Sequence, residues 1–273
     1  MNSPLEKFIS LFIDKTISVA VYDLQTGREI LVNADVMMHP ASTMKAPVMM
    51  EVFRQAEAGL LSLNDKLPIV NSFKSIVDGS GFALEEADDS ELTLYKRIGE
   101  SETIRELNRL MIVRSSNLAT NLLMERVGAS RVDTFIKELG IENMTVIRGL
   151  EDKKAYRLGM NNAASARSST QMMRLIAEGR VVSKQACDEM IRVMLDQEFN
   201  ESIPALLPSN VKVAHKTGWT GEFFHDIGII FSPNRKPYAI SLFTRDFPEN
   251  DEGQAHGCMA EISKIIYESF IQS

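Results

Sequence analysis

Ser42 and Lys45 stand three positions apart and combine a hydroxyl nucleophile with an amine. On a helix, residues i and i+3 share a face, so the Lys45 amine is expected beside the Ser42 oxygen. A serine attacks a carbonyl only when a base takes its proton, and a lysine whose pKa is lowered by burial can be that base. Free N–H groups at the start of the same helix can stabilise an oxyanion. The pair alone also fits a helix cap followed by a solvated lysine.

A second polar motif, Ser115-Ser116-Asn117, lies between two apolar runs, Leu107–Val113 and Leu118–Leu123. Polar residues in that position are expected to project into a cleft. Ser115 can relay a proton to a leaving nitrogen, and Asn117 can hold an amide carbonyl. Without partner motifs, the same residues fit a capping turn between two helices.

The third motif, Lys216-Thr217-Gly218, is expected to end a strand. Lys216 and Thr217 offer a site for a substrate carboxylate, and Gly218 lets a ligand lie against the backbone. The backbone N–H groups of Ser42 and Trp219 then form the expected oxyanion hole. Without the other motifs, Lys216-Thr217-Gly218 also fits an ordinary strand end and turn. Each of the three motifs is a weak signal alone, but the three in this order indicate acyl transfer through a serine ester.

The chain as a whole has 273 residues, 44% hydrophobic and 25% charged, which is ordinary for a globular protein with a sizeable core. A formal net charge of -7 argues against nucleic acid or an anionic membrane as a partner. Cys187 and Cys258 lack metal or redox spacing and are expected to be reduced, buried and inert. The four histidines lack zinc-site spacing, so no metal and no cofactor are expected.

The order of elements places strands at both ends of the chain and helices between them. The sequence predicts an amphipathic helix with apolar positions from Leu5 to Ile13 and a helix over about 42–57. The expected strands are 17–24, 28–33, 211–216, 225–231 and 237–244. One further helix is expected to begin after Thr103, and others are expected over about 132–139, 170–178, 184–195 and 252–270.

This order predicts an α+β fold: an antiparallel sheet built from both chain ends and flanked by helices, with an inserted all-helical subdomain. We expect 1–45 and 205–273 to form the α/β subdomain and 46–204 the helical one. The active site is expected at the seam between them, where sites commonly lie.

The three motifs resemble those of the penicillin-recognising serine hydrolases, and above all class A β-lactamases and their relatives. The resemblance covers nearly the whole chain, with Ser116 in place of the usual aspartate of Ser-Asp-Asn. It implies that Ser42 attacks an amide carbonyl, Lys45 takes its proton, and Ser115 passes a proton to the departing nitrogen.

Class A enzymes also use a glutamate to activate the water that cleaves the acyl-enzyme. Glu151, 34 residues past Asn117, fits that position. The resemblance therefore implies that Glu151 is the deacylating base. The alternative is an exposed loop acid paired with Arg148, although Arg148 itself is expected to anchor the loop.

Several positions depart from the family pattern. Ala155 stands where an asparagine helps to hold the water, and Arg245 is expected to replace a cation missing near Phe224 and His225. The segment 67–100 is longer than in typical secreted relatives. We therefore expect this chain to share the fold and the acylating residues of the family more closely than its turnover of antibiotics.

The resemblance leaves three functions open: hydrolysis of β-lactams, hydrolysis of another acyl compound such as a D-alanyl peptide or an ester, and a sensor that stays acylated. A small-molecule substrate, no nucleic acid or membrane partner and a monomer are expected in each case. The first residues do not resemble a secretory signal, which favours a cytoplasmic protein, or a secreted or periplasmic one if a leader is removed.

Overall fold

The central sheet is assembled from both ends of the chain. Its five antiparallel strands lie in the order β2 (Glu29–Val32), β1 (Thr16–Asp23), β11 (Tyr238–Arg245), β10 (Phe223–Phe231) and β9 (Lys212–Thr220). β1 pairs locally with β2 and, across the length of the sequence, with β11, where Thr16 faces Arg245. The predicted α+β fold is confirmed.

The computed structural model describes residues 3–248 and 251–271. Its helices are α1 (Pro4–Ile9), α2 (Lys45–Glu57), α3 (Ile104–Val113), α4 (Asn117–Val127), α5 (Ala129–Glu138), α6 (Lys153–Arg157), α7 (Ala166–Ala177), α8 (Lys184–Leu195) and α9 (Glu252–Ile271). Three 3₁₀ turns are η1 (Ala41–Met44), η2 (Glu86–Asp88) and η3 (Tyr95–Arg97). Three short strand pairs are β3 (Lys66–Pro68) with β6 (Ser101–Thr103), β4 (Phe73–Lys74) with β5 (Gly81–Phe82), and β7 (Met144–Thr145) with β8 (Ala163–Ala164).

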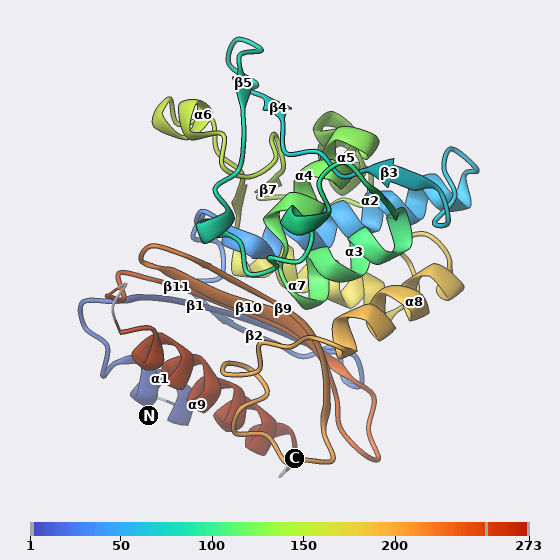
Figure 1. Ribbon diagram of the computed structural model, residues 1–273. Coiled ribbons are helices and arrows are strands. Elements are labelled where there is room, and N and C mark those ends of the chain that lie inside the picture. The colour runs from blue at the N-terminus through green and yellow to red at the C-terminus, as the bar shows by residue number, and fades with distance from the viewer. Residues whose placement is uncertain (1–2, 249–250, 272–273) are drawn as a thin grey trace.

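Both faces of the sheet are covered, so the molecule has a core on each side (Figure 1). Side chains alternate between the two faces of a strand. On β11, Ile240 and Leu242 therefore join the core under α1 and α9, whereas Ala239 and Phe243 join the larger core formed by the helices of the middle segment. Strands that are buried on both faces have near-continuous apolar sequences, and this pattern allowed β10 and β11 to be predicted.

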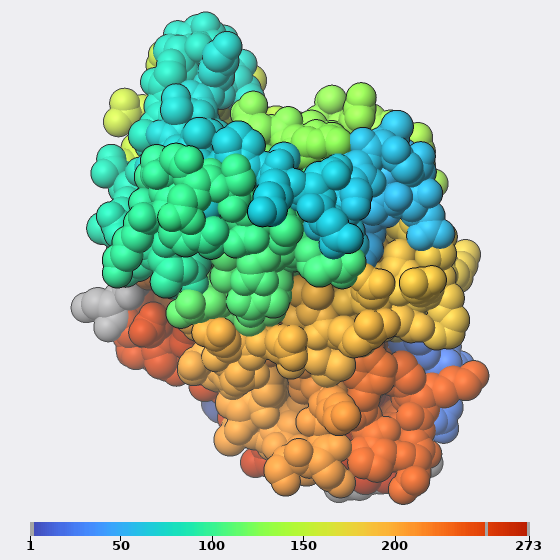
Figure 2. Space-filling view, turned by 45° about the vertical axis from the view of Figure 1, so that its right-hand side comes forward, coloured from blue at the N-terminus to red at the C-terminus, as the bar shows by residue number. Residues whose placement is uncertain are grey.

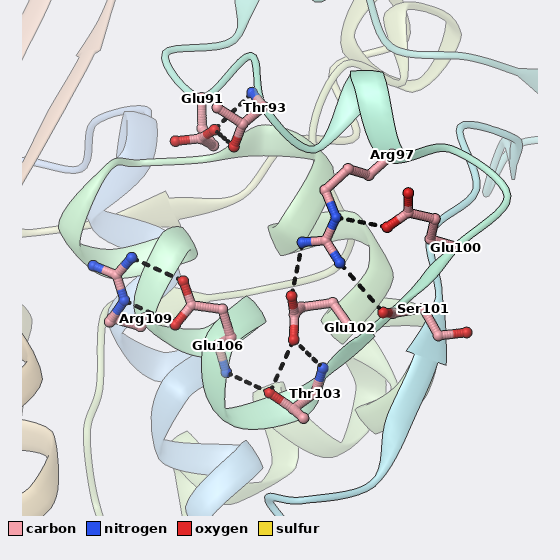
Figure 3. A network of polar contacts seen from close by, with 9 residues as sticks. All are labelled: Glu91, Thr93, Arg97, Glu100, Ser101, Glu102, Thr103, Glu106 and Arg109. Carbon is pink, nitrogen blue, oxygen red and sulfur yellow. Dashed lines mark hydrogen bonds and ion pairs between the residues drawn. The ribbon is translucent and has the colours of Figure 1, made fainter.

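The long segment between β3 and α3 contains little regular structure and is held by polar contacts. Figure 3 shows its C-terminal return, where the Arg97 guanidinium donates to the Glu100 and Glu102 carboxylates at 2.9 and 2.8 Å. The Thr103 hydroxyl then caps α3 by accepting from the Glu106 amide at 3.2 Å. The Glu106 carboxylate pairs with Arg109 and does not return to the Thr103 backbone.

Two predicted boundaries were wrong. The N-terminal helix ends at Ile9, and Ile13 is 89% exposed instead of continuing an apolar stripe. β9 continues through Lys216-Thr217-Gly218 to Thr220, because the whole motif pairs with β10 up to Phe223. The division into 1–45 with 205–273 and 46–204 stays a prediction. Within the described ranges, no helix is both long and apolar enough to cross a bilayer.

Candidate active site

Ser42 lies on η1, in the turn just before α2, and lines a cleft of about 930 Å³. The prediction that the serine belongs to the α-helix itself was wrong, since α2 begins at Lys45. Ala41 adopts a left-handed φ of 47°, a strained conformation for a residue with a side chain, and it directs the chain into the turn. In the described part of the chain, the Ser42 hydroxyl makes no hydrogen bond, which leaves it free to react with a molecule in the cleft.

Ser115 joins the three motifs. Its hydroxyl lies 3.2 Å from the Lys45 amine and 3.0 Å from the Lys216 amine. Lys45 also donates to the Ser115 carbonyl at 2.6 Å and to the Asn117 amide oxygen at 2.8 Å. Ser115 has a left-handed φ of 55° between α3 and α4. Residues from α2, the α3–α4 junction and β9 therefore meet at one hydroxyl.

Both lysines are fully buried, and burial works against a charged amine. Burial lowers the pKa of Lys45 to about 7, although the nearby Asp89 and Glu151 carboxylates oppose the shift. Burial and the neighbouring Lys45 charge lower the pKa of Lys216 well below its usual value, with Asp226 opposing. Near neutral pH a substantial fraction of Lys45 is therefore an uncharged amine that can accept a proton.

Gly218 allows β9 to pack directly against the Ser42 turn. A Cβ atom at this position would lie 2.9 Å from the backbone nitrogens of Ser42 and Thr43. Such a contact would force the backbones apart. Thr217, Gly218 and Trp219 line the same cleft as Ser42, and Trp219 is 51% exposed to it. The backbone N–H groups expected to hold an oxyanion thus belong to two chain segments in close contact.

Glu151 lies on the loop before α6, also in the cleft, with a left-handed φ of 58°. One carboxylate oxygen accepts from the Asn117 amide at 3.0 Å, and the other accepts from the Glu85 backbone N–H at 3.0 Å. Burial raises the pKa of Glu151; these two hydrogen bonds oppose the shift, and Asp88 and Asp89 add to it. The carboxylate is therefore oriented and more basic than an exposed glutamate.

Arg148 does not pair with Glu151. It donates to the Met160 carbonyl at 2.8 Å, the Gly149 carbonyl at 2.9 Å and the Asn161 side-chain oxygen at 2.7 Å. The bonds to Met160 and Asn161 join the start of the acid loop, which we define as residues 148–157, to the chain that follows α6. The inner side of the loop is held by Asn121, which exchanges two hydrogen bonds of 2.7 and 3.0 Å with the Leu150 backbone.

Asp89 was not predicted as a site residue. Its carboxylate accepts from the Leu118 amide at 2.9 Å and from the Ser116 hydroxyl at 3.4 Å, at the N-terminus of α4. A carboxylate missing from the Ser-Ser-Asn motif is thus supplied by the long segment before α3. Asp88-Asp89 in an acidic, irregular stretch looks like a solvated turn, so only the three-dimensional contact identifies it.

The prediction that Arg245 replaces the missing cation was wrong. Arg245 contacts Thr16 at 3.3 Å and Asp246 at 3.4 Å, and it is absent from the cleft lining formed by the described residues. The reason is topological, since β10 separates β11 from the strand that carries Lys216. The cleft lining instead includes Glu201, Glu252 and His256.

Comparisons with known proteins cover nearly the whole chain. Residues 4–270 match the profile of the beta-lactamase enzyme family. The extended-spectrum beta-lactamase PER-1 of Pseudomonas aeruginosa is 25% identical over 98% of this chain and 88% of its own, and beta-lactamase BRO-1 of Moraxella catarrhalis is 25% identical over 83% and 71%.

Solved structures show the same fold. The L158E mutant of PBP-A, an acyl-enzyme complex with penicillin G, superposes with a TM-score of 0.84 at 24% identity, over 98% of this chain and 95% of its own. A beta-lactamase from Sphaerobacter thermophilus superposes with a TM-score of 0.82 at 22% identity, over 97% and 96%.

Proposed function

Because this chain belongs to the beta-lactamase enzyme family, we propose that it opens β-lactam amides by forming and then hydrolysing an ester on Ser42. The observation that carries the proposal is the meeting of the Lys45 and Lys216 amines at the Ser115 hydroxyl, in a cleft that Ser42 also lines. A serine without catalytic partners would not require two buried amines at one hydroxyl.

In the acylation step, the Ser42 oxygen bonds to the lactam carbonyl carbon while its proton passes to the uncharged Lys45 amine. The backbone N–H groups of Ser42 and Trp219 stabilise the negative oxygen that develops. The C–N bond then breaks, and the nitrogen receives a proton from Ser115, which Lys45 restores. Lys216 and Thr217 bind the substrate carboxylate, and Asn117 binds the amide side chain.

In the deacylation step, Glu151 takes a proton from a water whose oxygen bonds to the ester carbon. Collapse of the tetrahedral species breaks the bond between Ser42 and that carbon, and the proton returns to the serine oxygen. Asn117 contacts both Glu151 and Lys45, so it couples the groups that serve the two steps. Ala155, fully buried on α6, leaves water placement to Glu151 and Asn117.

Intact-mass measurement over time tests this proposal with penicillin G, which a structural relative is described as holding in an acyl-enzyme. We expect a transient adduct on the wild type that disappears as product forms, and no adduct on Ser42→Ala. A stable adduct would favour the sensor function. If the wild type forms no adduct at all, the β-lactam proposal is wrong, and thioester and D-alanyl peptide turnover become the next assays.

A further inference from the structure

The hairpin segment, which we define as residues 71–89, lies directly against the acid loop. Figure 1 shows β4 and β5 beside α6, and Figure 2 shows this part of the chain projecting from the helical side of the molecule. At the base of the segment, Asn71 exchanges two hydrogen bonds with the Leu84 backbone, at 3.0 and 2.8 Å. These bonds hold both arms of the segment together before it reaches the cleft.

The most buried link between the two segments is at Asp152, next to Glu151. Its carboxylate accepts from the Ser75 hydroxyl at 3.0 Å and from the Ile76 amide at 2.9 Å. It also accepts from the Ala155 amide at 3.0 Å, where it caps α6. Asp152 is only 3% exposed, so water cannot readily replace these partners.

A second link lies at the surface. The Lys154 amine donates to the Asp78 carboxylate at 2.8 Å and to the Ser80 hydroxyl at 2.7 Å. Asp78 and Ser80 occupy the turn of the hairpin, so Lys154 ties the turn to α6. Exposed ion pairs contribute little singly, but this one adds to the buried link two residues earlier.

The segment also contacts the catalytic groups themselves. The Glu85 amide donates to Glu151, and the Asp88 carbonyl accepts from the Asn117 amide at 3.0 Å. Glu151 has a left-handed φ of 58°, and a residue other than glycine keeps that conformation only where its surroundings impose it. The Glu151 oxygen that is not bonded to Asn117 thus accepts its hydrogen bond from the hairpin segment, and the neighbouring residue, Asp152, is held by the same segment.

We propose that the hairpin segment positions Glu151 for deacylation, and that Ser75 and Lys154 are positioning residues for that step. The inference rests on the proposed function. Loosening the links allows the acid loop to shift, so the Glu151 carboxylate no longer meets the attacking water correctly. Formation of the ester depends on Ser42, Lys45 and Ser115. The hydrogen bonds that Asp152 and Lys154 make with the hairpin segment involve none of these residues.

The test measures the two chemical steps separately in Lys154→Ala, in Ser75→Ala/Lys154→Ala and in the rescue variant Lys154→Arg. Lys184→Ala is the matched control, since Lys184 is also an exposed lysine paired with an aspartate, Asp188, at 2.6 Å on α8. Rapid-quench mass spectrometry with penicillin G gives the acylation and deacylation rate constants. Hydrogen exchange at the amides of Ile76, Glu85 and Ala155 reports whether the links have opened.

We expect deacylation to fall about threefold in Lys154→Ala and about tenfold in the double variant, with acylation within about twofold of the wild type. Exchange at the three amides should be faster, and Lys154→Arg should restore the rate. The inference is wrong if deacylation is unchanged although exchange is faster, if exchange itself is unchanged, or if both rate constants fall together. Should the double variant fail to fold, Lys154→Ala alone decides, since that side chain is 46% exposed.

Failure of the proposed function gives a different result. If Ser42→Ala still gains the mass of penicillin, or if Glu151→Gln deacylates at the wild-type rate, the assigned chemistry is wrong whatever the hairpin variants do. If Glu151→Gln accumulates adduct and the hairpin variants behave as the wild type, the chemistry stands and only the positioning role falls.

Discussion

The two sides of the cleft are built in different ways. On the sheet side, Lys45 and Lys216 are fully buried on α2 and β9 and meet Ser115 in the interior. On the opposite side, Glu151 lies on an irregular loop that is held by side-chain contacts to Asn117 and to another irregular segment. The two lysines assigned to acylation therefore belong to packed secondary structure, whereas the glutamate assigned to deacylation lies on a loop that another irregular segment holds in place.

This difference indicates how easily each step can be altered. A close-packed core resists movement, and changing it costs stability. Loops tolerate substitution and carry much of the functional variation among related proteins. We therefore expect variants on the sheet side to lose acylation together with stability, and variants on the loop side to lose deacylation while the fold persists.

The largest expected effect is that of Glu151→Gln, which removes the base but keeps the shape of the side chain. Deacylation should fall by about 10³-fold, since a positioned base contributes about 10²–10⁴-fold. Acylation should continue, so the adduct should accumulate in a mass-spectrometric time course. Glu125→Gln, an exposed acid on α4, is the control. Equal loss of both steps would contradict the division between the two sides.

Gly218 and Gly149 lie on opposite sides of the cleft, and alanine at either position should affect a different step. In Gly218→Ala the new Cβ would lie 2.9 Å from two backbone nitrogens of the Ser42 turn. Acylation should fall by about 10²-fold, and the free energy of unfolding should fall by about 1–3 kcal/mol. In Gly149→Ala the new Cβ would lie 2.5 Å from the Asn121 side-chain oxygen, which supports the acid loop, so deacylation should suffer more.

Stopped-flow kinetics and thermal unfolding separate these two outcomes. Gly257→Ala on α9 is the control, because a Cβ there meets nothing within 4 Å. Alanine also favours a helix over glycine, so this variant should be neutral or slightly more stable. The comparison fails if Gly149→Ala slows acylation as much as Gly218→Ala does.

The pH dependence of acylation should report the Lys45 amine. Its pKa is lowered to about 7, and only the uncharged amine accepts the serine proton, so the rate should rise with pH through about 7. Asp89 favours the charged amine, so Asp89→Asn should lower the pKa of Lys45 and move this rise to lower pH. The same change weakens the N-terminus of α4 by about 1 kcal/mol. A pH profile of acylation that is identical in both proteins would exclude Lys45 as the base.

The smallest expected effect concerns substrate charge. Glu201 and Glu252 line the cleft, and neither has an ion-pair partner within the described ranges. β-Lactams with a cationic side chain should therefore have a severalfold higher kcat/KM than those with an additional carboxylate, and salt should reduce the difference. The double variant Glu201→Gln/Glu252→Gln should remove most of it. If the preference survives in that variant, it arises elsewhere.

The sequence predicted the sheet side well. Apolar runs with β-branched residues identified β1, β10 and β11, and the Lys184–Leu195 helix was predicted at its observed bounds. These elements are determined by burial, which leaves a periodic signal in the chain. Short motifs then marked the residues that those elements bring together.

The loop side could not be predicted to the same extent. Glu151 was assigned through the family resemblance, but its contact with the Glu85 backbone involves no side chain of Glu85 and leaves no trace in residue type. Asp89, Ser75 and Lys154 are ordinary polar residues in polar stretches, and their roles depend on which loop lies beside which. The path of β9 through the Lys-Thr-Gly motif was missed because glycine usually signals a turn.

The pairing of β1 with β11 also has a consequence for synthesis on the ribosome. β1 can form its hairpin with β2 at once, but its other edge must wait for Tyr238–Arg245 to be translated. At 5 to 20 residues per second, that delay lasts roughly 10 to 45 seconds. During this time an apolar strand edge stays available to the wrong partner, so newly made chains are the form of this protein most in need of chaperones.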